Sequence, residues 1–448
     1  MSVSRLVCAG CGAEPARDDP FPFACPNAGT GDVDHVLRRE LDLAAVEFPA
    51  DDGEPNPFVR FRGLLHAYHV AREGGIPDED FVALVRALDA RVAEVDGHGF
   101  RVTPFARADA LSEQLGFGVW VKDETGNVSG SHKARHLFGV LVWLEVAERL
   151  GLTSERPDLA IASCGNAALA AAVVAAAGGR TLRVFVPVDA DPVVLARLEA
   201  LGARIATCPR EPGVPGDPTV HKLKEALAAG ALPFTCQGDL NGLAVEGGET
   251  LAWEMAGAPV DRVVVQVGGG ALASGLVHGF REAAALGAIP RSPRLDTVQT
   301  AGAWPLRRAF DRLGGHDAAY AAHHRSEFMW PWEEEPRSVA HGILDDETYD
   351  WVAVVEGMLA TGGTPIVVDE ATLERANALG RDATGIDVDH TGSSGFAGLL
   401  ALAERGEIGR GENVAVLFTG VRRSTQPETK ESTDAELSGS RHPVAQGL

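Results

Sequence analysis

The chain has 448 residues, of which 45% are hydrophobic and 52 are glycine, so it is long enough for two or three packed units with a sizeable core. Its formal net charge of −23 opposes binding to nucleic acid, and no basic stripe with interleaved aromatics is present. Apolar runs such as residues 167–178 are too short and alanine-rich to span a bilayer, and the start MSVSRLVCAG carries no apolar signal segment. We therefore expect a cytoplasmic protein with no nucleic acid and no membrane as partner.

Residues 1–57 form an N-terminal extension rich in Cys, Asp and Pro, and we expect it to be irregular. Its partial Cys knuckle, Cys8-x-x-Cys11, is followed by Cys25, and His35 is the nearest candidate for a fourth ligand. Such spacing can hold tetrahedral Zn²⁺, but a strong signal needs two such pairs. We therefore expect a metal-free remnant, with reduced thiols since no secretory signal is present.

Apolar residues recur at helical spacing between residues 58 and 95, which predicts helices there. Beyond them, short apolar or β-branched runs alternate with Ala- and Leu-rich helical stretches. The runs are residues 159–162, 182–188, 204–207, 262–267, 295–299 and 414–419. Alternation of this kind predicts a layered α/β protein with mostly parallel sheets, whose ligands lie beyond the carboxyl ends of the strands.

Lysine is rare, and one lysine stands apart from the other four. Lys133 follows Ser129-Gly130-Ser131-His132 at the start of a predicted helix, where the helix dipole disfavours its charged form and small neighbours allow a carbonyl to approach. A solvated surface lysine is the alternative. That alternative fits the remaining lysines better: Lys122 beside acidic residues, Lys222 and Lys224 in a polar helix, and Lys430 in the tail.

A second loop, Ser163-Cys164-Gly165-Asn166-Ala167, follows the run 159–162 and precedes an Ala-rich helix. Amides and small polar side chains at a helix start suit an anion such as a substrate carboxylate, and Asn166 could donate to a phenolate oxygen. A simple helix cap is the alternative, and the two are compatible.

A third loop, Gly268-Gly269-Gly270-Ala271-Leu272, follows the run 262–267. Consecutive glycines let backbone N–H groups converge on a phosphate, although a tight turn is the simpler explanation for a glycine triplet. The run 414–419 ends in Thr419, whose neutral hydroxyl could hydrogen-bond a pyridine nitrogen.

Together these loops resemble the tryptophan synthase β-like family, or fold type II, of enzymes that depend on pyridoxal 5'-phosphate (PLP). The family includes threonine synthase, threonine and serine dehydratases and cysteine synthase, and the resemblance runs from about residue 101 to 423. It implies two layered α/β domains with the cofactor between them, and a homodimer. The expected large domain comprises residues 58–134 and 246–423, the small mobile domain residues 135–245, and the flexible tail residues 424–448.

The resemblance also assigns roles to residues. Lys133 would hold PLP in a Schiff base, with His132 packing against the ring. Asn166 would contact the 3'-oxygen, and Thr419 the pyridine nitrogen. The phosphate would bind Gly268, Gly269, Gly270, Ala271 and Leu272, where Ala271 replaces the usual fourth glycine. The substrate would bind Ser163, Gly165, Asn166 and Ala167.

The features divide between two reactions. Lys133-Ala134-Arg135 and the glycine triplet look like the dehydratases, whereas Thr419 and the N-terminal cysteines look like threonine synthase. We expect a lyase that removes water from a β-hydroxy-α-amino acid such as threonine, serine or an aryl-serine, giving a 2-oxo acid and ammonia. Threonine synthase acting on O-phosphohomoserine, its phosphate held by an arginine such as Arg135 or Arg337, is one alternative. A catalytically silent amino-acid-binding relative is another.

Aromatic residues concentrate in the run 328–332. Such a cluster usually packs in a core or an interface. If it lined the cleft instead, it would favour a substrate with a bulky or aryl side chain.

Overall fold

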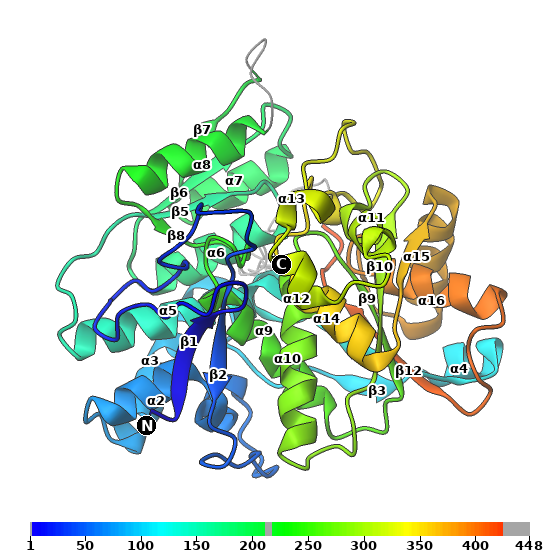
Figure 1. The fold of residues 1–448 in the computed structure, drawn as a ribbon, viewed down its shortest axis with the longest axis horizontal. Helices are drawn as coiled ribbons and strands as arrows, with labels where there is room; N and C mark the ends of the chain where they lie inside the picture. Colours follow the sequence, from blue (N-terminus) through cyan, green and yellow to red (C-terminus); the bar gives the residue numbers. More distant parts are fainter. Residues whose placement is uncertain (1, 211–216, 424–448) are drawn as a thin grey trace, which may run out of the picture.

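The computed structural model describes residues 2–210 and 217–423, and its architecture rests on two sheets with helices between and around them (Figure 1). The larger sheet has six strands in the order β11-β10-β9-β12-β4-β3. They are β3 (Phe105–Arg107), β4 (Gly118–Asp123), β9 (Arg262–Gln266), β10 (Arg294–Thr300), β11 (Pro365–Val368) and β12 (Asn413–Phe418). All pairs are parallel except β3 with β4 at one edge.

The smaller sheet has four parallel strands in the order β7-β6-β5-β8. They are β5 (Leu159–Ala162), β6 (Leu182–Val186), β7 (Arg204–Thr207) and β8 (Leu232–Pro233). All four lie inside the segment 135–245 that the sequence predicts as a small domain. That this segment moves as a unit stays a prediction.

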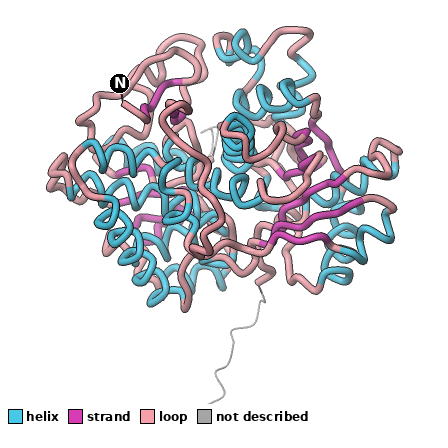
Figure 2. The backbone as a smooth tube through the Cα atoms, turned by 90° about the horizontal axis from the view of Figure 1, so that it is seen from below, coloured by secondary structure: helices cyan, strands magenta, loops and turns pink. Residues whose placement is uncertain are grey.

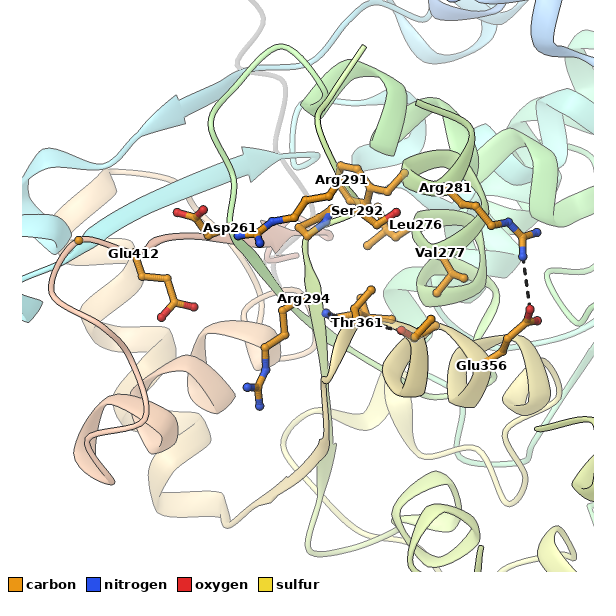
Figure 3. A pocket seen from close by; sticks show the side chains of 16 residues that line it. Asp261, Leu276, Val277, Arg281, Arg291, Ser292, Arg294, Glu356, Thr361 and Glu412 are labelled. Carbon is orange, nitrogen blue, oxygen red and sulfur yellow. Dashed lines mark hydrogen bonds and ion pairs between the residues drawn. The ribbon is translucent and has the colours of Figure 1, made fainter. Parts of the chain in front are cut away.

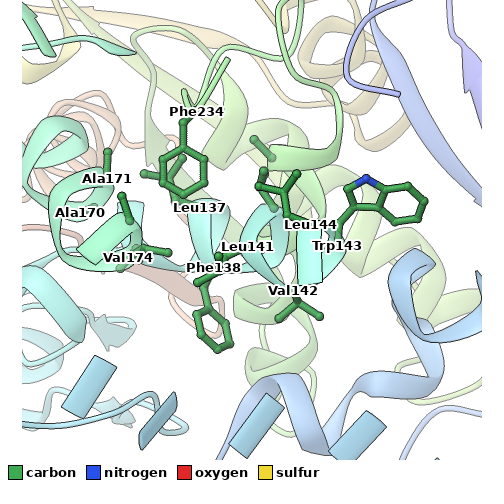
Figure 4. Packing of buried hydrophobic residues seen from close by; sticks show 14 of the residues in the cluster. Leu137, Phe138, Leu141, Val142, Trp143, Leu144, Ala170, Ala171, Val174 and Phe234 are labelled. Carbon is green, nitrogen blue, oxygen red and sulfur yellow. The ribbon is translucent and has the colours of Figure 1, made fainter. Parts of the chain in front are cut away.

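Three central helices, α5 (Lys133–Arg149), α9 (Leu243–Met255) and α10 (Ala271–Ala285), connect the two halves of the molecule. Helix α5 is apolar on nearly all sides, which is typical of a fully buried helix. Its side chains pack against α6 (Asn166–Ala177) in one continuous core (Figure 4). Lys133, the first residue of α5, therefore begins a helix that is packed firmly in the core.

The other helices pack around the two sheets and the central helices (Figure 2). They are α1 (Pro57–Arg60), α2 (His66–Glu73), α3 (Asp78–Asp96), α4 (Asp109–Leu115), α7 (Pro192–Ala200), α8 (Pro218–Ala228), α11 (Pro305–Arg312), α12 (Ala318–Ala322), α13 (Arg325–Phe328), α14 (Trp351–Thr361), α15 (Glu370–Thr384) and α16 (Ser394–Glu404). Short 3-10 turns lie at Arg62–Leu64, Val128–Gly130 and His341–Ile343. No helix in residues 2–210 and 217–423 is long and apolar enough to cross a membrane.

The expectation of an irregular N-terminal extension is wrong in part. Strands β1 (Ser4–Cys8) and β2 (Leu37–Leu41) form an antiparallel pair. The hairpin is anchored because Arg39 of β2 is buried against three glutamates of α9 and α10. These are Glu246, Glu249 and Glu282.

Each of the six runs predicted from the sequence contains a strand, with ends that agree within two residues. Strands β3, β4, β8 and β11 were not predicted. Lys122 and Asp123 interrupt the apolar pattern of β4, and β3 and β8 have only three and two residues. The predicted flexible tail, residues 424–448, lies outside the described residues.

Candidate active site

The fold brings the lysine loop onto the end of β12. Lys133 begins α5, and the N–H of His132 donates to the carbonyl of Thr419 at 3.1 Å. Ser131 forms an isolated bridge with Gly420. Lys133 and Thr419, far apart in the sequence, therefore share one site at the carboxyl ends of the large sheet, as predicted for parallel sheets.

The Thr419 hydroxyl is oriented by a side chain that the sequence analysis missed. Gln266, the last residue of β9, donates from Nε2 to Thr419 Oγ1 at 2.7 Å and to the Gly392 carbonyl at 2.9 Å. Since Oγ1 already accepts this bond, the hydroxyl hydrogen is available for another acceptor, such as a pyridine nitrogen. A glutamine ending a strand of valines was the available signal.

The glycine loop lies at the start of α10 and is tightly covered. Gly270 has φ +101°, which favours glycine. A Cβ on Gly268 would lie 2.2 Å from a carboxylate oxygen of Asp345, and one on Gly269 would lie 2.9 Å from the Tyr349 ring. The loop is thus a cradle of backbone groups that only glycine allows.

The covering segment, residues 345–350, is acidic and was not predicted as part of the site. Thr348 Oγ1 donates to the Gly268 carbonyl at 3.0 Å, and the Gly269 N–H bonds the Asp345 carboxyl. Burial raises the pKa of Asp345 to about 6, although the positive charge of Lys133 opposes this shift. Burial also raises the pKa of Asp350 well above its ordinary value. We call Asp345, Asp350 and Lys133 the acidic pocket.

Two buried imidazoles, His132 and His136, lie close to Lys133. Burial, followed by the charge of Lys133, lowers the pKa of His136 to about 3 and that of His132 well below its ordinary value. The His136 Nδ1–H donates to the Ala244 carbonyl at 2.7 Å. Both rings are therefore neutral at physiological pH, so they add no positive charge beside Lys133.

The second predicted loop also reaches the site, through Asn166 at the start of α6. Arg423 donates from Nη2 to Asn166 Oδ1 at 2.9 Å and to the Ser129 carbonyl at 2.8 Å. Ser163 Oγ accepts from the Gly165 N–H at 3.4 Å within the loop. The contacts of Asn166 with a cofactor, and of Ser163, Gly165, Asn166 and Ala167 with a substrate, stay predictions.

The interpretation of Lys122 as a solvated lysine is wrong. Lys122 is fully buried and forms an ion pair with Glu254, while Arg135 bonds Glu124 Oε2 at 2.8 Å and Glu254 as well. We call these four residues the buried ion network. Lys222 and Lys224 are exposed on α8 as predicted, and Lys430 lies outside the described residues.

Packing explains the aromatic cluster of residues 328–332. Phe328 and Met329 are buried in the core, and the guanidinium of Arg308 lies 3.8 Å from the Trp330 ring centroid. Arg337 is exposed and pairs with Glu335. Arg135 is fully buried against Glu124 and Glu254.

A pocket of about 850 Å³ lies elsewhere, at the amino ends of β9 and β10 (Figure 3). Arg281, Arg291 and Arg294 line it together with Glu356. In parallel α/β sheets the chemistry takes place at the opposite, carboxyl ends. We therefore assign the candidate active site to the surroundings of Lys133.

The residues around Lys133 fit PLP on structural grounds. The glycine cradle begins a 15-residue helix, so backbone N–H groups and the helix dipole favour a phosphate there. Lys133 and the oriented Thr419 hydroxyl suit an aldehyde and a ring nitrogen. The Asp345 carboxyl, which now takes one N–H of the cradle, must give it up or be protonated when a phosphate binds.

Comparisons with known proteins point to one family of enzymes. The sequence profile of a family described as "Pyridoxal-phosphate dependent enzyme" matches residues 97–420. Threonine synthase from Methanocaldococcus jannaschii is 28% identical over 327 residues, covering 71% of this chain and 74% of that protein.

Solved structures share the fold at low identity. Processed threonine deaminase isoform 2 from Solanum lycopersicum gives a TM-score of 0.57 at 18% identity, over 78% of this chain and 91% of that one. Serine racemase from maize gives a TM-score of 0.57 at 18% identity, over 77% of this chain and 94% of that one. The predicted fold type II architecture is confirmed.

Proposed function

Because the chain belongs to the family of pyridoxal-phosphate dependent enzymes, we propose that it eliminates water from a β-hydroxy-α-amino acid. Threonine, serine or an aryl-serine would serve as substrate. The reaction breaks the Cα–H and Cβ–O bonds and releases water, and hydrolysis of the resulting enamine gives a 2-oxo acid and ammonia. The enzyme would then be an ammonia-lyase of the dehydratase type.

The charge of the acidic pocket is the observation that supports this proposal. Asp345 and Asp350 lie near Lys133, and the Asp345 carboxylate, when ionised, would repel a second phosphate brought in on a substrate side chain. A neutral hydroxyl group meets no such repulsion. Arg135 and Arg337, the arginines considered for that phosphate, already pair with the carboxylates of Glu124 and Glu335.

The residues supply the remaining chemistry. PLP, when bound, provides an aldehyde for the amino group and a conjugated ring that delocalises negative charge from Cα. The Lys133 amine takes the Cα proton, and the Thr419 hydroxyl donates a hydrogen bond to the ring nitrogen without protonating it. Asp345, whose pKa is about 6, can hold a proton for the departing hydroxyl.

Threonine synthesis from O-phosphohomoserine is a second candidate, favoured by the Methanocaldococcus jannaschii relative and by Arg423. The Arg423 guanidinium bonds Asn166 at the cleft, and a guanidinium can bind a phosphate in bidentate fashion. An acidic neighbour, Asp389, opposes the negative charge of that phosphate. Asp389 lies close enough to raise the pKa of Arg423, although burial lowers this pKa overall.

One substrate panel separates the two reactions. L-threonine, L-serine, β-phenylserine and O-phospho-L-homoserine are offered to the PLP-loaded enzyme, and 2-oxo acid, ammonia and inorganic phosphate are measured. We expect 2-oxo acid and ammonia in equal amounts from at least one hydroxy amino acid. Phosphate release with threonine formation, and no 2-oxo acid, would replace the dehydratase by the synthase.

The variant Arg423→Gln tests whether Arg423 binds the substrate phosphate. It should raise KM for O-phosphohomoserine at least about tenfold if Arg423 binds the substrate phosphate, and should change the KM for threonine or serine much less. Arg375→Gln, at an exposed pair with Glu404, is the matched control. Silence on all four substrates, despite a visible band from lysine-bound PLP, would favour a binding protein.

We also propose a homodimer in the cytoplasm, with the segment 135–245 closing over the substrate. Family resemblance alone supports these points. Light scattering that gives a monomer mass at working concentration would contradict the dimer. Equal protease sensitivity of this segment with and without substrate would contradict the closure.

A further inference from the structure

The N-terminal hairpin places four potential metal ligands around one point, although the sequence offers only one Cys-x-x-Cys pair. Cys8 ends β1, Cys11 follows in the turn, and Cys25 and His35 arrive from the connection to β2. Their three sulfur atoms and one ring nitrogen all lie within 4.8 Å of one another. None of these residues belongs to the candidate active site.

The distances inside this cluster match those of a tetrahedral zinc site. With Zn–S near 2.3 Å and Zn–N near 2.0 Å, the edges of such a site are about 3.8 Å between two sulfurs and about 3.5 Å between sulfur and nitrogen. Cys11 Sγ lies 3.6 Å from Cys25 Sγ, and Cys8 Sγ lies 3.6 Å from His35 Nδ1. A metal at the centre therefore requires only small shifts of these side chains.

Hydrogen bonds with neighbouring backbone groups favour the metal-binding forms of His35 and of two cysteines. His35 Nε2 lies 2.9 Å from the Thr30 carbonyl, so Nε2 carries the proton and Nδ1 offers its lone pair to the cluster, as in metal-bound histidines. Backbone N–H groups donate to two of the sulfurs, from Cys11 to Cys8 at 3.5 Å and from Asn27 to Cys25 at 3.3 Å. Such bonds favour thiolates, which are the form that binds zinc.

A disulfide is the competing explanation for the pair Cys11 and Cys25. The six cysteines in the structure are free, and a bond between these two would leave Cys8 and the oriented His35 without a role. A ligand set of three sulfurs and one imidazole nitrogen suits Zn²⁺ better than a hard cation such as Mg²⁺ or Ca²⁺.

We propose that Cys8, Cys11, Cys25 and His35 bind one structural Zn²⁺. This proposal replaces the expectation of a metal-free remnant. The sequence lacks a second Cys-x-x-Cys pair, but Cys25 and His35 supply the third and fourth ligands. All four positions are taken by the protein, so the site is closed and stabilises the fold, with no open position for catalysis.

A bound zinc would hold in place the residues next to His35 in the chain, which contact the rest of the protein. Asp34, next to His35, accepts from Trp351 Nε1 at 3.1 Å, and its N–H donates to the Ala322 carbonyl at 2.7 Å. Arg39 follows four residues later and is buried against the glutamates of α9 and α10. Loss of the metal should therefore loosen the hairpin from α9, α10, α12 and α14.

Metal analysis of the purified PLP-loaded protein tests the proposal. We expect about one zinc per chain, and less than about a tenth of that in Cys8→Ser and Cys25→Ser. Cys208→Ser, a buried cysteine outside the cluster, should keep the wild-type amount. Zinc that persists in both cluster variants would overturn the proposal.

Two further measurements guard against variants that misfold. Wild-type protein stripped by chelator should bind Co²⁺ with the visible bands of tetrahedral thiolate coordination, and should melt at a lower temperature until zinc returns. Alkylation of the denatured, unreduced protein should modify six cysteines; modification of only four would reveal a disulfide. Absence of both zinc and cobalt binding would also refute the site.

Discussion

Two groups of buried charges, both next to α5, differ in how they are balanced. The buried ion network holds two cations, Lys122 and Arg135, against two anions, Glu124 and Glu254, all fully buried. In the acidic pocket, Asp350 is buried, while Asp345 and Lys133 are only partly buried, and loss of solvent raises the pKa of both carboxyls.

The comparison separates structural charges from reactive ones. A paired and hydrogen-bonded network keeps its protonation states fixed, because each partner stabilises the charge of the other. A carboxyl whose pKa is raised by burial, such as that of Asp345 at about 6, can exchange a proton near neutral pH, which is a property of catalytic sites. We therefore interpret the network around Arg135 as structural, and we propose that Lys133, the first residue of α5, is the reactive group.

The largest expected effect comes from removing the lysine of the acidic pocket. Lys133→Ala should lower kcat at least about a thousandfold, since it removes both the attachment point and the base. Borohydride reduction and peptide mapping should place the cofactor on Lys133 in the wild type. Lys224→Ala, an exposed lysine of α8, is the control, and a label there would contradict the assignment.

Breaking the buried ion network should cost stability more than activity. Glu254→Gln leaves Arg135 and Lys122 with one carboxylate, and this imbalance should lower the free energy of unfolding by about 3 kcal/mol. Urea unfolding measures the change. A loss below about 1 kcal/mol would mean that the two groups of charges do not differ in the way described.

Neutralising a carboxyl of the acidic pocket should raise the free energy of unfolding, whereas breaking the buried ion network lowers it. The pKa of Asp345 is about 6 in the folded protein, above the ordinary 3.8, so its contribution to stability is present below pH 4 and lost as the pH rises through 6. Asp345→Asn should therefore stabilise the apoprotein by about 2 to 3 kcal/mol at pH 8 and by little at pH 4. Equal effects at both pH values would refute the raised pKa.

The smallest effect is expected at an exposed ion pair. Glu404→Gln removes the partner of Arg375, and both side chains are more than half exposed. Unfolding free energy should fall by less than about 0.5 kcal/mol at low salt and by less still at high salt. A loss as large as that of Glu254→Gln would remove the distinction between buried and exposed pairs.

The sequence was sufficient for those parts of the site that depend on local chemistry. Lys133, the glycine loop and Thr419 each sit at the end of a predicted element, and parallel strands bring such ends together. Gln266 and Asp345 were missed because their roles arise from contacts across the fold. The glutamine that ends a strand of valines was a signal, but it identifies no partner, and the acidic loop has no distinctive pattern of its own.

By itself, the sequence determined the PLP family, the alternation of strands and helices, and the residue that begins α5, because periodicity and loop composition are local properties. Only the tertiary structure decided which charges are paired. Lys122 looked solvated beside acidic neighbours, yet its partner Glu254 is 132 residues away. Likewise, the ligands of the proposed zinc site converge only when β1 pairs with β2, since burial and long-range pairing are not encoded in any short stretch of the chain.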